Sequence, residues 1–365
     1  MKKHTKMLSL LLVLCLALSL AACGSSADKT PAADSQPSAE PTPSPTPTAT
    51  PEPEPTPSEE PESVLDTELP VNVMVLNGTT GFGMAKLITD AGEGSAQLNY
   101  SFSVETDASN ITAALINGTA DIAALPTNAA SVVYNKTEGA VQVLALNTLG
   151  VLYLVVNSET ESISSMADLR GKTVYAPAQN PTFIFSYLCS QNGLEVGSDI
   201  VIDNTYAQPA DLRTAVAAGE VDIAVLPEPM VTIACSSNDK LTVALDLTEE
   251  WDAVAPAGSL VQGCVVVRAA FAQEHPQEVQ AFLEEYEASI AFLSEDPEAA
   301  GQAIESSGVF TNAKVAQKAI GKCNVCFITG DEMQSAMSQF LDIMFTVAPA
   351  SIGGAVPGDD FYCIF

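Results

Sequence analysis

The chain has 365 residues, of which 14 are basic and 45 acidic, and its formal net charge is −31 at pH 7. This charge excludes a generic nucleic-acid-binding protein, because such proteins need a basic surface to neutralise phosphates. Histidine occurs only at His4 and His275, which argues against histidine-rich metal sites and Ser–His–Asp catalysis. Apolar residues make up 47% of the chain, enough for a sizeable core. The length predicts about two domains.

Residues 1–22 are predicted to be an export signal. Lysines within residues 2–6 precede an apolar run over residues 7–22 that is short for a membrane-spanning helix. The run ends in Ala21-Ala22-Cys23, which resembles the lipobox of bacterial lipoproteins. The resemblance implies lipidation of Cys23 and a protein tethered to the outer face of the cytoplasmic membrane. Ordinary secretion with a coincidental cysteine is the alternative.

Residues 23–63 are predicted to be a linker between this anchor and the folded body. Eleven prolines lie within residues 31–61, interleaved with Thr, Ser and Glu. Proline at this density prevents helix and sheet hydrogen bonding and favours extended polyproline II. We therefore expect a stalk that carries the body away from the membrane.

The body contains an internal repeat. Residues 118–126 and 219–227 share six of nine amino acids at an offset of 101, and the same offset aligns Phe82 with Phe183. In each half, strands alternate with helices, which implies parallel sheets built from βαβ units. The predicted fold class is therefore α/β with two lobes, each a mainly parallel sheet flanked by helices, and a ligand cleft between the lobes.

The predicted elements follow the repeat in chain order. The first half is expected to contain strands at 71–76, 98–104 and 121–125 and helices at 82–90 and 108–117. The second half is expected to contain strands at 173–176, 200–203 and 222–226 and helices at 183–192 and 210–218. Gly118 and Gly219 are expected to end the second helix of each half.

Two longer apolar runs, 151–156 and 260–267, are candidates for strands that join the lobes. The chain after them is predicted to be helical and to pack back on the first lobe. Thr329 and Glu332 resemble a capping box for a helix that extends to about Phe345. The expected domains are lobe I over residues 64–160 and 250–365, and lobe II over residues 161–249.

The candidate binding residues follow the strands, because ligands of open α/β sheets bind beyond the carboxyl ends of strands. Their side chains and backbone groups offer hydrogen bonds: Thr79, Thr80, Gly81, Phe82, Thr127, Asn128, Gln179, Asn180, Thr182 and Glu228. Phe82 and Phe183 either stack on a planar ligand or belong to the core. Glu228 either faces the ligand, where it would disfavour an anion, or caps a helix.

The order of these motifs resembles the substrate-binding lipoproteins of ABC importers. The similarity is greatest to the nitrate/sulfonate/taurine class, which is related to binders of thiamine-pyrimidine precursors. It covers about residues 70–365 and rests on six stretches: 75–86, 121–128, 147–153, 168–174, 222–229 and 263–268. It implies a type II periplasmic-binding fold, capture of a small solute by lobe closure, a permease partner, a monomer, no cofactor and no catalysis.

The solute and two competing functions stay open at this stage. The four strand-end loops contain no Lys or Arg, so sulfonate, nitrate, an amino-pyrimidine and other small solutes all remain candidates. A ligand-sensing lipoprotein without transport is one alternative. The other is a thiamine-pyrimidine-synthase-like enzyme, but His275 lies at the predicted start of a tail helix, away from the strand ends.

Two further motifs suggest nucleotide binding and metal binding, but neither is complete. The glycine-rich residues 78–86 match neither the G-x-G-x-x-G pattern of dinucleotide-binding folds nor the Gly-Lys-Ser/Thr of the P-loop. Cys323 and Cys326 form a single CxxC, whereas a zinc site needs four ligands. No metal site is therefore predicted, and these cysteines are interpreted as structural. A disulfide involving Cys323, Cys326 or Cys363 is left open.

Overall fold

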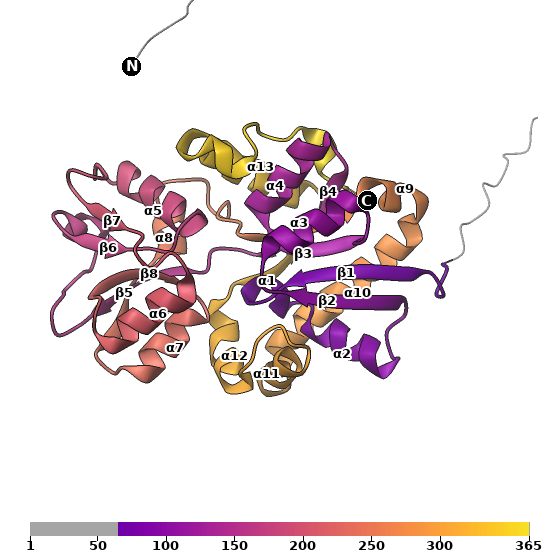
Figure 1. The fold of residues 1–365 in the computed structure, drawn as a ribbon, viewed down its shortest axis with the longest axis horizontal. Coiled ribbons are helices and arrows are strands. Elements are labelled where there is room, and N and C mark those ends of the chain that lie inside the picture. The colour runs from indigo at the N-terminus through magenta and orange to yellow at the C-terminus, as the bar shows by residue number, and fades with distance from the viewer. Residues whose placement is uncertain (1–64, 365) are drawn as a thin grey trace, which may run out of the picture. The chain divides into compact units, whose positions relative to one another are not determined.

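Two separate β-sheets organise residues 65–364, the part of the chain that this computed structural model describes (Figure 1). These residues belong to one compact unit of the chain. The predicted export signal, Cys23 and the proline-rich linker lie outside the described residues. Within those residues, every helix is too short or too polar to cross a bilayer.

The first sheet has the strand order β11-β4-β10-β3-β1-β2. β1 pairs in parallel with β2 and β3, whereas β10 runs antiparallel to both β3 and β4. The buried side of β1 carries Val71, Val73 and Val75, which alternate with more exposed residues as a half-buried strand requires. The strands of this sheet are β1 (Pro70–Leu76), β2 (Asn99–Glu105), β3 (Ile122–Pro126), β4 (Val141–Thr148), β10 (Gly263–Arg268) and β11 (Val325–Ile328).

The second sheet has the order β7-β6-β8-β5-β9. β6 pairs in parallel with β7 and β8, and β5 runs antiparallel to β8 and β9. This arrangement repeats that of β2-β1-β3-β10-β4, so the sequence repeat corresponds to a repeat of topology. The strands are β5 (Leu152–Asn157), β6 (Thr173–Tyr175), β7 (Val201–Asp203), β8 (Ile223–Pro227) and β9 (Leu241–Asp246).

The predicted α/β class with two lobes is confirmed, and both sheets are mixed. In each sheet three parallel strands come from one half of the chain. The strand that follows a crossing between the lobes, β10 in the first sheet and β5 in the second, pairs with them in the antiparallel direction. The lobe boundary expected at residue 161 places β5 in the first lobe, whereas hydrogen bonding to β8 and β9 places it in the second sheet. The chain therefore crosses between the lobes around residues 149–151 and 253–262.

Helices cover both sheets. Gly118 and Gly219 end α3 and α6 in the same left-handed conformation, with φ of 76° in both. The helices of the first half are α1 (Thr79–Phe82), α2 (Ala85–Glu93), α3 (Ala108–Asn117) and α4 (Thr127–Thr137). Those of the second half are α5 (Asn180–Gln191), α6 (Pro209–Ala218), α7 (Met230–Ser237) and α8 (Leu247–Asp252).

The helix expected over residues 82–90 is divided into α1 and α2 near Gly83. A Cβ at Gly83 would lie 2.8 Å from Cγ1 of Ile290 and 3.0 Å from the hydroxyl of Tyr286. Both residues belong to the long tail helix α10 (Pro276–Glu295), which packs against α2. The glycine is needed for this close approach, and it marks the place where the chain changes direction.

The C-terminal helices pack on the first lobe, as the sequence predicts, and also contact the second lobe. α12 (Ala313–Ala319) contacts α7, and α13 (Gly330–Val347) contacts α5. Trp251 of α8 packs against α13, with its ring centroid 5.9 Å from that of Phe340. α13 begins after Thr329 as predicted, although the Thr329 side chain makes no capping hydrogen bond. The remaining tail helices are α9 (Ala269–Glu274) and α11 (Pro297–Ser306).

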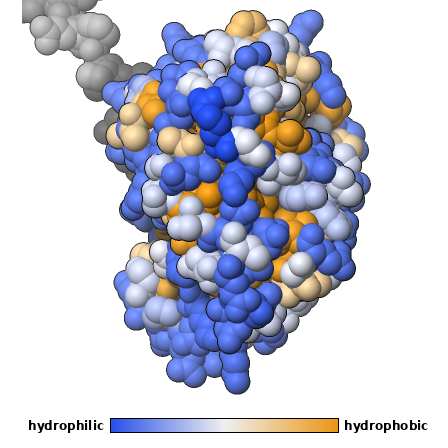
Figure 2. Space-filling model, turned by 90° about the vertical axis from the view of Figure 1, so that its left-hand side faces the viewer, coloured by the Kyte–Doolittle hydropathy of each residue, from blue (hydrophilic) through white to orange (hydrophobic). Residues whose placement is uncertain are grey.

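The second lobe presents a mainly hydrophilic surface. On the side of the molecule formed by this lobe, hydrophilic residues cover most of the face, and apolar residues show between them near its middle (Figure 2). The apolar side chains of its sheet, such as Val155 and Leu226, are fully buried. The core of this lobe is therefore enclosed by helices and polar loops.

Candidate functional site

A central cavity of about 430 Å³ lies between the lobes, at the carboxyl ends of strands from both sheets. The first lobe contributes residues 76–80, Thr106, Pro126, Thr148 and Phe310 to its lining. The second lobe contributes Asn180, residues 208–210 and residues 227–230, and Val151 and Gln262 come from the crossing segments. This position is the one that the strand-end argument predicts for a ligand.

Four of the candidate residues line this cavity: Thr79, Thr80, Asn180 and Glu228. α1, which begins with Thr79 and Thr80, is held on the side away from the cavity lining, because Nδ2 of the buried Asn147 donates to the backbone oxygen of Thr80 over 3.1 Å. The first lobe therefore presents two threonine side chains to the cavity from a fixed backbone.

Gly81 and Phe82 lie behind the cavity and not in its lining. A Cβ at Gly81 would lie 2.6 Å from the backbone oxygen of Leu76, so this glycine allows α1 to pack against β1. Phe82 is fully buried, and its ring meets that of Phe310 edge to face at 6.1 Å between centroids. The core interpretation therefore holds for Phe82. Phe310, which lies outside the repeat, is the aromatic residue at the cavity.

The hydroxyls of Thr127 and Thr182 form hydrogen bonds to the backbone of neighbouring segments. Oγ1 of Thr127 donates to the backbone oxygen of Val261 over 2.8 Å, and Thr127 is fully buried. Oγ1 of Thr182 donates to the backbone oxygen of Pro177 over 2.7 Å and accepts a hydrogen bond from Nδ2 of Asn204. Both threonines fix loops around the cavity from outside its lining.

Asn128, Gln179 and Phe183 line a second cavity, which we call the side cavity. Its volume is about 500 Å³, and it lies among α3, α4, the start of α5 and the 3₁₀ helix Pro349–Ile352. Asn128 lies where the two cavities adjoin, because its Oδ1 accepts a hydrogen bond of 2.8 Å from Nδ2 of Asn180. Three candidates for the central cavity are thus displaced to its neighbour.

Glu228 lines the cavity and also accepts a capping hydrogen bond at the start of a helix. Its side chain is buried, at 2% relative exposure for the residue. Oε2 accepts the backbone N–H of Thr232 over 3.0 Å, and Oε1 accepts the Thr232 hydroxyl over 2.9 Å. Burial raises the pKa of the Glu228 carboxyl, and the bonds from Thr232 and the charge of Lys322 oppose this rise.

The electrostatics of the central cavity do not favour an anion. Its lining contains no Lys or Arg, and Glu228 is the charged residue among the lining residues. Pro181 and Pro209 lie in the first turns of α5 and α6, where proline offers no N–H. At α7, the N–H of Thr232 is occupied by Glu228. The site can therefore offer a buried carboxylate, threonine hydroxyls and amide side chains to a neutral or positively charged ligand.

Gln262 is a lining residue that sequence analysis missed. Its Oε1 accepts the N–H of Val151 over 2.8 Å, and its own N–H donates to the backbone oxygen of Thr148 over 2.9 Å. The residue therefore holds the two crossing segments together beside the cavity. Gln262 lies in the second apolar run, and no repeat or motif marks it as functional.

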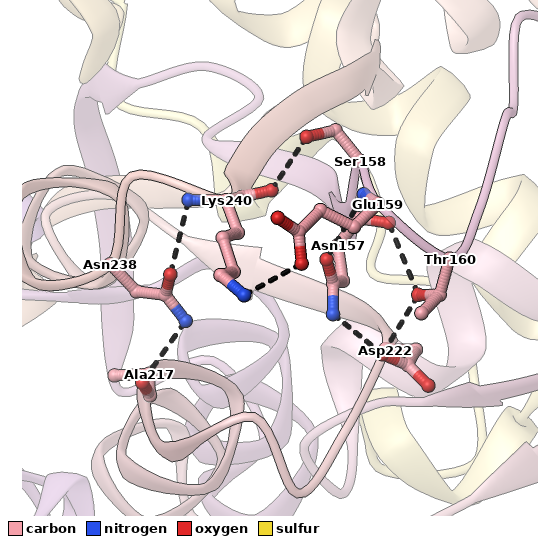
Figure 3. Close-up of polar contacts among 8 residues, drawn as sticks. All are labelled: Asn157, Ser158, Glu159, Thr160, Ala217, Asp222, Asn238 and Lys240. Atoms are coloured by element: carbon pink, nitrogen blue, oxygen red, sulfur yellow. Dashed lines mark hydrogen bonds and ion pairs between the residues drawn. The ribbon is translucent and has the colours of Figure 1, made fainter.

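The aspartates of the repeat lie at the opposite ends of their strands from the cavity. Asp121 accepts hydrogen bonds from Asn72 and pairs with Arg268, at 2.7 Å between Oδ1 and Nη2. In the second lobe, Oδ1 of Asp222 accepts hydrogen bonds from Asn157 and Thr160, both 3.0 Å (Figure 3). The most similar stretch of the repeat therefore serves the scaffold, with an aspartate joining neighbouring segments at the same place in each sheet.

The CxxC motif supports the first crossing segment. Cys323 is buried and Cys326 partly buried, all six cysteines of the described residues are free, and burial raises the pKa of the Cys326 thiol to about 12. Between them, Asn324 accepts the N–H of Leu149 over 3.0 Å and donates to the backbone oxygen of Gly150 over 2.6 Å. Thiols of this kind are poor nucleophiles. Within residues 65–364, no cluster of His, Cys, Asp and Glu has the arrangement of a metal site.

Comparisons with known proteins agree with this architecture. The family model described as NMT1/THI5 like matches residues 95–300. A crystal structure of an ABC transporter from Parabacteroides distasonis superposes with a TM-score of 0.68 at 22% identity, covering 82% of this chain and 99% of that chain. The periplasmic aliphatic sulphonate binding protein SsuA from Escherichia coli superposes with a TM-score of 0.63 at 16% identity, covering 80% and 95%.

The periplasmic nitrate-binding protein NrtA from Synechocystis PCC 6803 superposes with a TM-score of 0.57 at 12% identity, covering 79% of this chain and 85% of that chain. No curated protein sequence matches the chain. At these identities the superpositions establish the fold, a two-lobed periplasmic-binding architecture, and leave the ligand to be argued from the residues of this cavity.

Proposed function

Since this chain belongs to the NMT1/THI5-like family, we propose that it is the solute-binding component of an ABC importer and acts outside the cytoplasm. The observation that carries the proposal is the central cavity, which lies between two lobes that are joined by only two crossing segments. Opening about these segments would admit a solute, and closing would bury it between hydrogen-bonding groups from both lobes.

The proposed location follows from the N-terminal sequence. Residues 1–22 would direct export, and lipid on Cys23 would hold the protein at the outer face of the cytoplasmic membrane. The proline-rich linker would then let the body reach a permease in the same membrane. The protein would act there as a monomer, with the hinge between the two lobes lying at the crossings near residues 149–151 and 253–262.

We propose a small neutral or cationic solute that carries N–H donors, such as an amino-pyrimidine. The buried carboxylate of Glu228 favours a donor or a positive charge near it, and a bare anion would meet this carboxylate without a cationic partner from the lining. The net charge of −31 adds to this preference, because its field opposes the approach of anions. Sulfonate and nitrate, which structural relatives are named for binding, are therefore the less favoured candidates here.

Binding without catalysis is the part of the proposal that the lining residues support. The ligand-binding candidates Thr79, Thr80, Asn180 and Glu228 include a single ionisable group, and its carboxylate already accepts two hydrogen bonds from Thr232. His275 directly precedes α10 and is not among the residues that line the cavity. A ligand-sensing lipoprotein without transport would use the same cavity, and the two functions differ in the partner protein.

A thermal-shift screen of residues 61–365 tests the proposal. Amino-pyrimidines, other small amines, sulfonates and nitrate would be compared, with each compound also applied to the Glu228→Gln variant. A ligand present at about 100 times its Kd adds about 2.7 kcal/mol to the unfolding free energy. We expect stabilisation by an N–H-bearing compound and less stabilisation of the variant. Turnover of a compound, or stabilisation by sulfonate or nitrate alone, would contradict the proposal.

A further inference from the structure

A hydrogen bond between two asparagines joins the lobes where the central and side cavities meet. Asn128 is the second residue of α4, which follows β3 of the first sheet. Asn180 is the first residue of α5, which follows β6 of the second sheet. Nδ2 of Asn180 donates to Oδ1 of Asn128 over 2.8 Å. The bond therefore spans the gap between the lobes and can form only while they are closed.

The orientation of this pair is set from one side. Nδ2 of Asn128 donates to the backbone oxygen of Ser351 over 3.4 Å, which turns Oδ1 of Asn128 towards Asn180. The Nδ2 group of Asn180 is the donor of this bond. Its Oδ1 is buried without a hydrogen-bond partner among residues 65–364. Asn180 also lines the central cavity. A buried acceptor without a donor is costly, so the pair is held at the expense of one unsatisfied oxygen.

The backbone next to the pair is strained. Gln179 has φ of 67° and ψ of −130°, a conformation that residues other than glycine rarely adopt. It precedes Asn180, lines the side cavity, and accepts the N–H of Phe183 over 3.0 Å as α5 begins. Backbone strain of this kind is found at ligand clamps and switch regions, where the surrounding structure maintains it.

From these three observations we propose that Asn128 and Asn180 form a latch between the lobes and set the balance between the closed and open states. The inference rests on the proposed function for its purpose, which is to retain a solute once the lobes have closed. Opening the latch separates the lobes at this edge and joins the central cavity to the side cavity. The latch is part of the protein alone, so it acts before any solute has bound.

Three variants distinguish a latch from a general structural role. Asn128→Ala removes the acceptor. Asn180→Asp removes the donor and keeps a side chain of the same size. Asn135→Ala is the matched control, because Asn135 also lies on α4 and binds the same C-terminal segment, through Ile352 and Ala355 at 2.8 Å, without lining either cavity.

Small-angle X-ray scattering without solute measures the result on residues 61–365, the compact unit with its own core. We expect the ratio of open to closed molecules to rise about fivefold in both latch variants, as the loss of one neutral hydrogen bond implies. Their radius of gyration should exceed that of the wild type and of Asn135→Ala. Equal scattering of wild type and latch variants, or equal opening of the control, would overturn the latch. Since no solute is used, the outcome is independent of the solute screen.

Discussion

Thr232 donates its backbone N–H to one oxygen of the Glu228 carboxylate and its hydroxyl to the other. The two residues are four apart at the start of α7, so the acidic side chain at the cavity also completes the N-terminus of a helix. This arrangement fixes the carboxylate with one side bonded to the protein and leaves its remaining lone pairs for a ligand.

The stability of the protein should depend on the ionisation of Glu228. Burial raises the pKa of this carboxyl above its ordinary value of 4.5, so the folded state keeps a proton that the unfolded chain has released. The free energy of unfolding should therefore fall as the pH rises from the ordinary pKa through the raised one. Urea unfolding between about pH 4 and pH 8 should show this slope in the wild type and a flatter one in Glu228→Gln.

Thr232→Val provides the companion measurement. The Thr232 hydroxyl stabilises the ionised carboxylate, so its removal should raise the pKa of Glu228 further and extend the slope to higher pH. Identical pH profiles for the wild type and Glu228→Gln would show that this carboxyl does not titrate differently on folding.

A cationic solute should bind more tightly as the pH rises, because the ionised form of Glu228 attracts it. Glu228→Gln should weaken binding roughly 10- to 100-fold, the range for a hydrogen bond to a charged group, and should remove most of the pH dependence. Isothermal titration calorimetry at two pH values would measure both effects. Affinity that falls with rising pH, while the solute keeps its charge, would place the solute away from this carboxylate.

The two aspartates of the repeat should differ in their contribution to stability. Asp121 is 6% exposed and pairs with Arg268, so Asp121→Asn should lower the unfolding free energy by about 2 kcal/mol. Asp222 is exposed, and Asp222→Asn should cost about 0.5 kcal/mol or less. Chemical denaturation of the two variants is the measurement. Equal losses would mean that the shared position, and not the ion pair, determines the effect.

Gly150 should tolerate no larger side chain at the first crossing. A Cβ there would overlap Oγ1 of Thr248 and lie 2.7 Å from Cδ2 of Leu260. Gly150→Ala should therefore cost about 1–3 kcal/mol through overpacking. Adding Thr248→Ala removes one of the two clashes and should restore part of the loss. If the double variant is no more stable than the sum of the single variants predicts, the clash with Thr248 is not the cause.

Local sequence features were enough to predict much of the fold. The period-2 burial of β1, the glycines that end α3 and α6, and the offset of 101 between the halves are short-range properties that survive folding. The expectation that β5 belongs to the first lobe is wrong, because a short apolar strand can pair with either sheet. Its partners β8 and β9 are determined by tertiary packing, which no periodicity encodes.

The candidate site was predictable in position but not in detail. Strand ends identified the loops that carry Thr79, Thr80, Asn180 and Glu228 to the central cavity. They did not distinguish a hydroxyl that faces the cavity from one such as that of Thr127, which bonds to the crossing segment. Gln262 and Phe310 were missed because their segments enter the site from outside the repeat.

The sequence by itself determined the α/β repeat, the acidic charge, the absence of Lys and Arg from the strand-end loops and the family resemblance. These follow from composition and from patterns within a few residues of one another. The tertiary structure decided that Asn128 binds Asn180, that Phe82 is core and that Glu228 is both a helix cap and a cavity wall. Those outcomes depend on which groups from distant segments meet, and each buried polar group takes the partner that packing brings within reach.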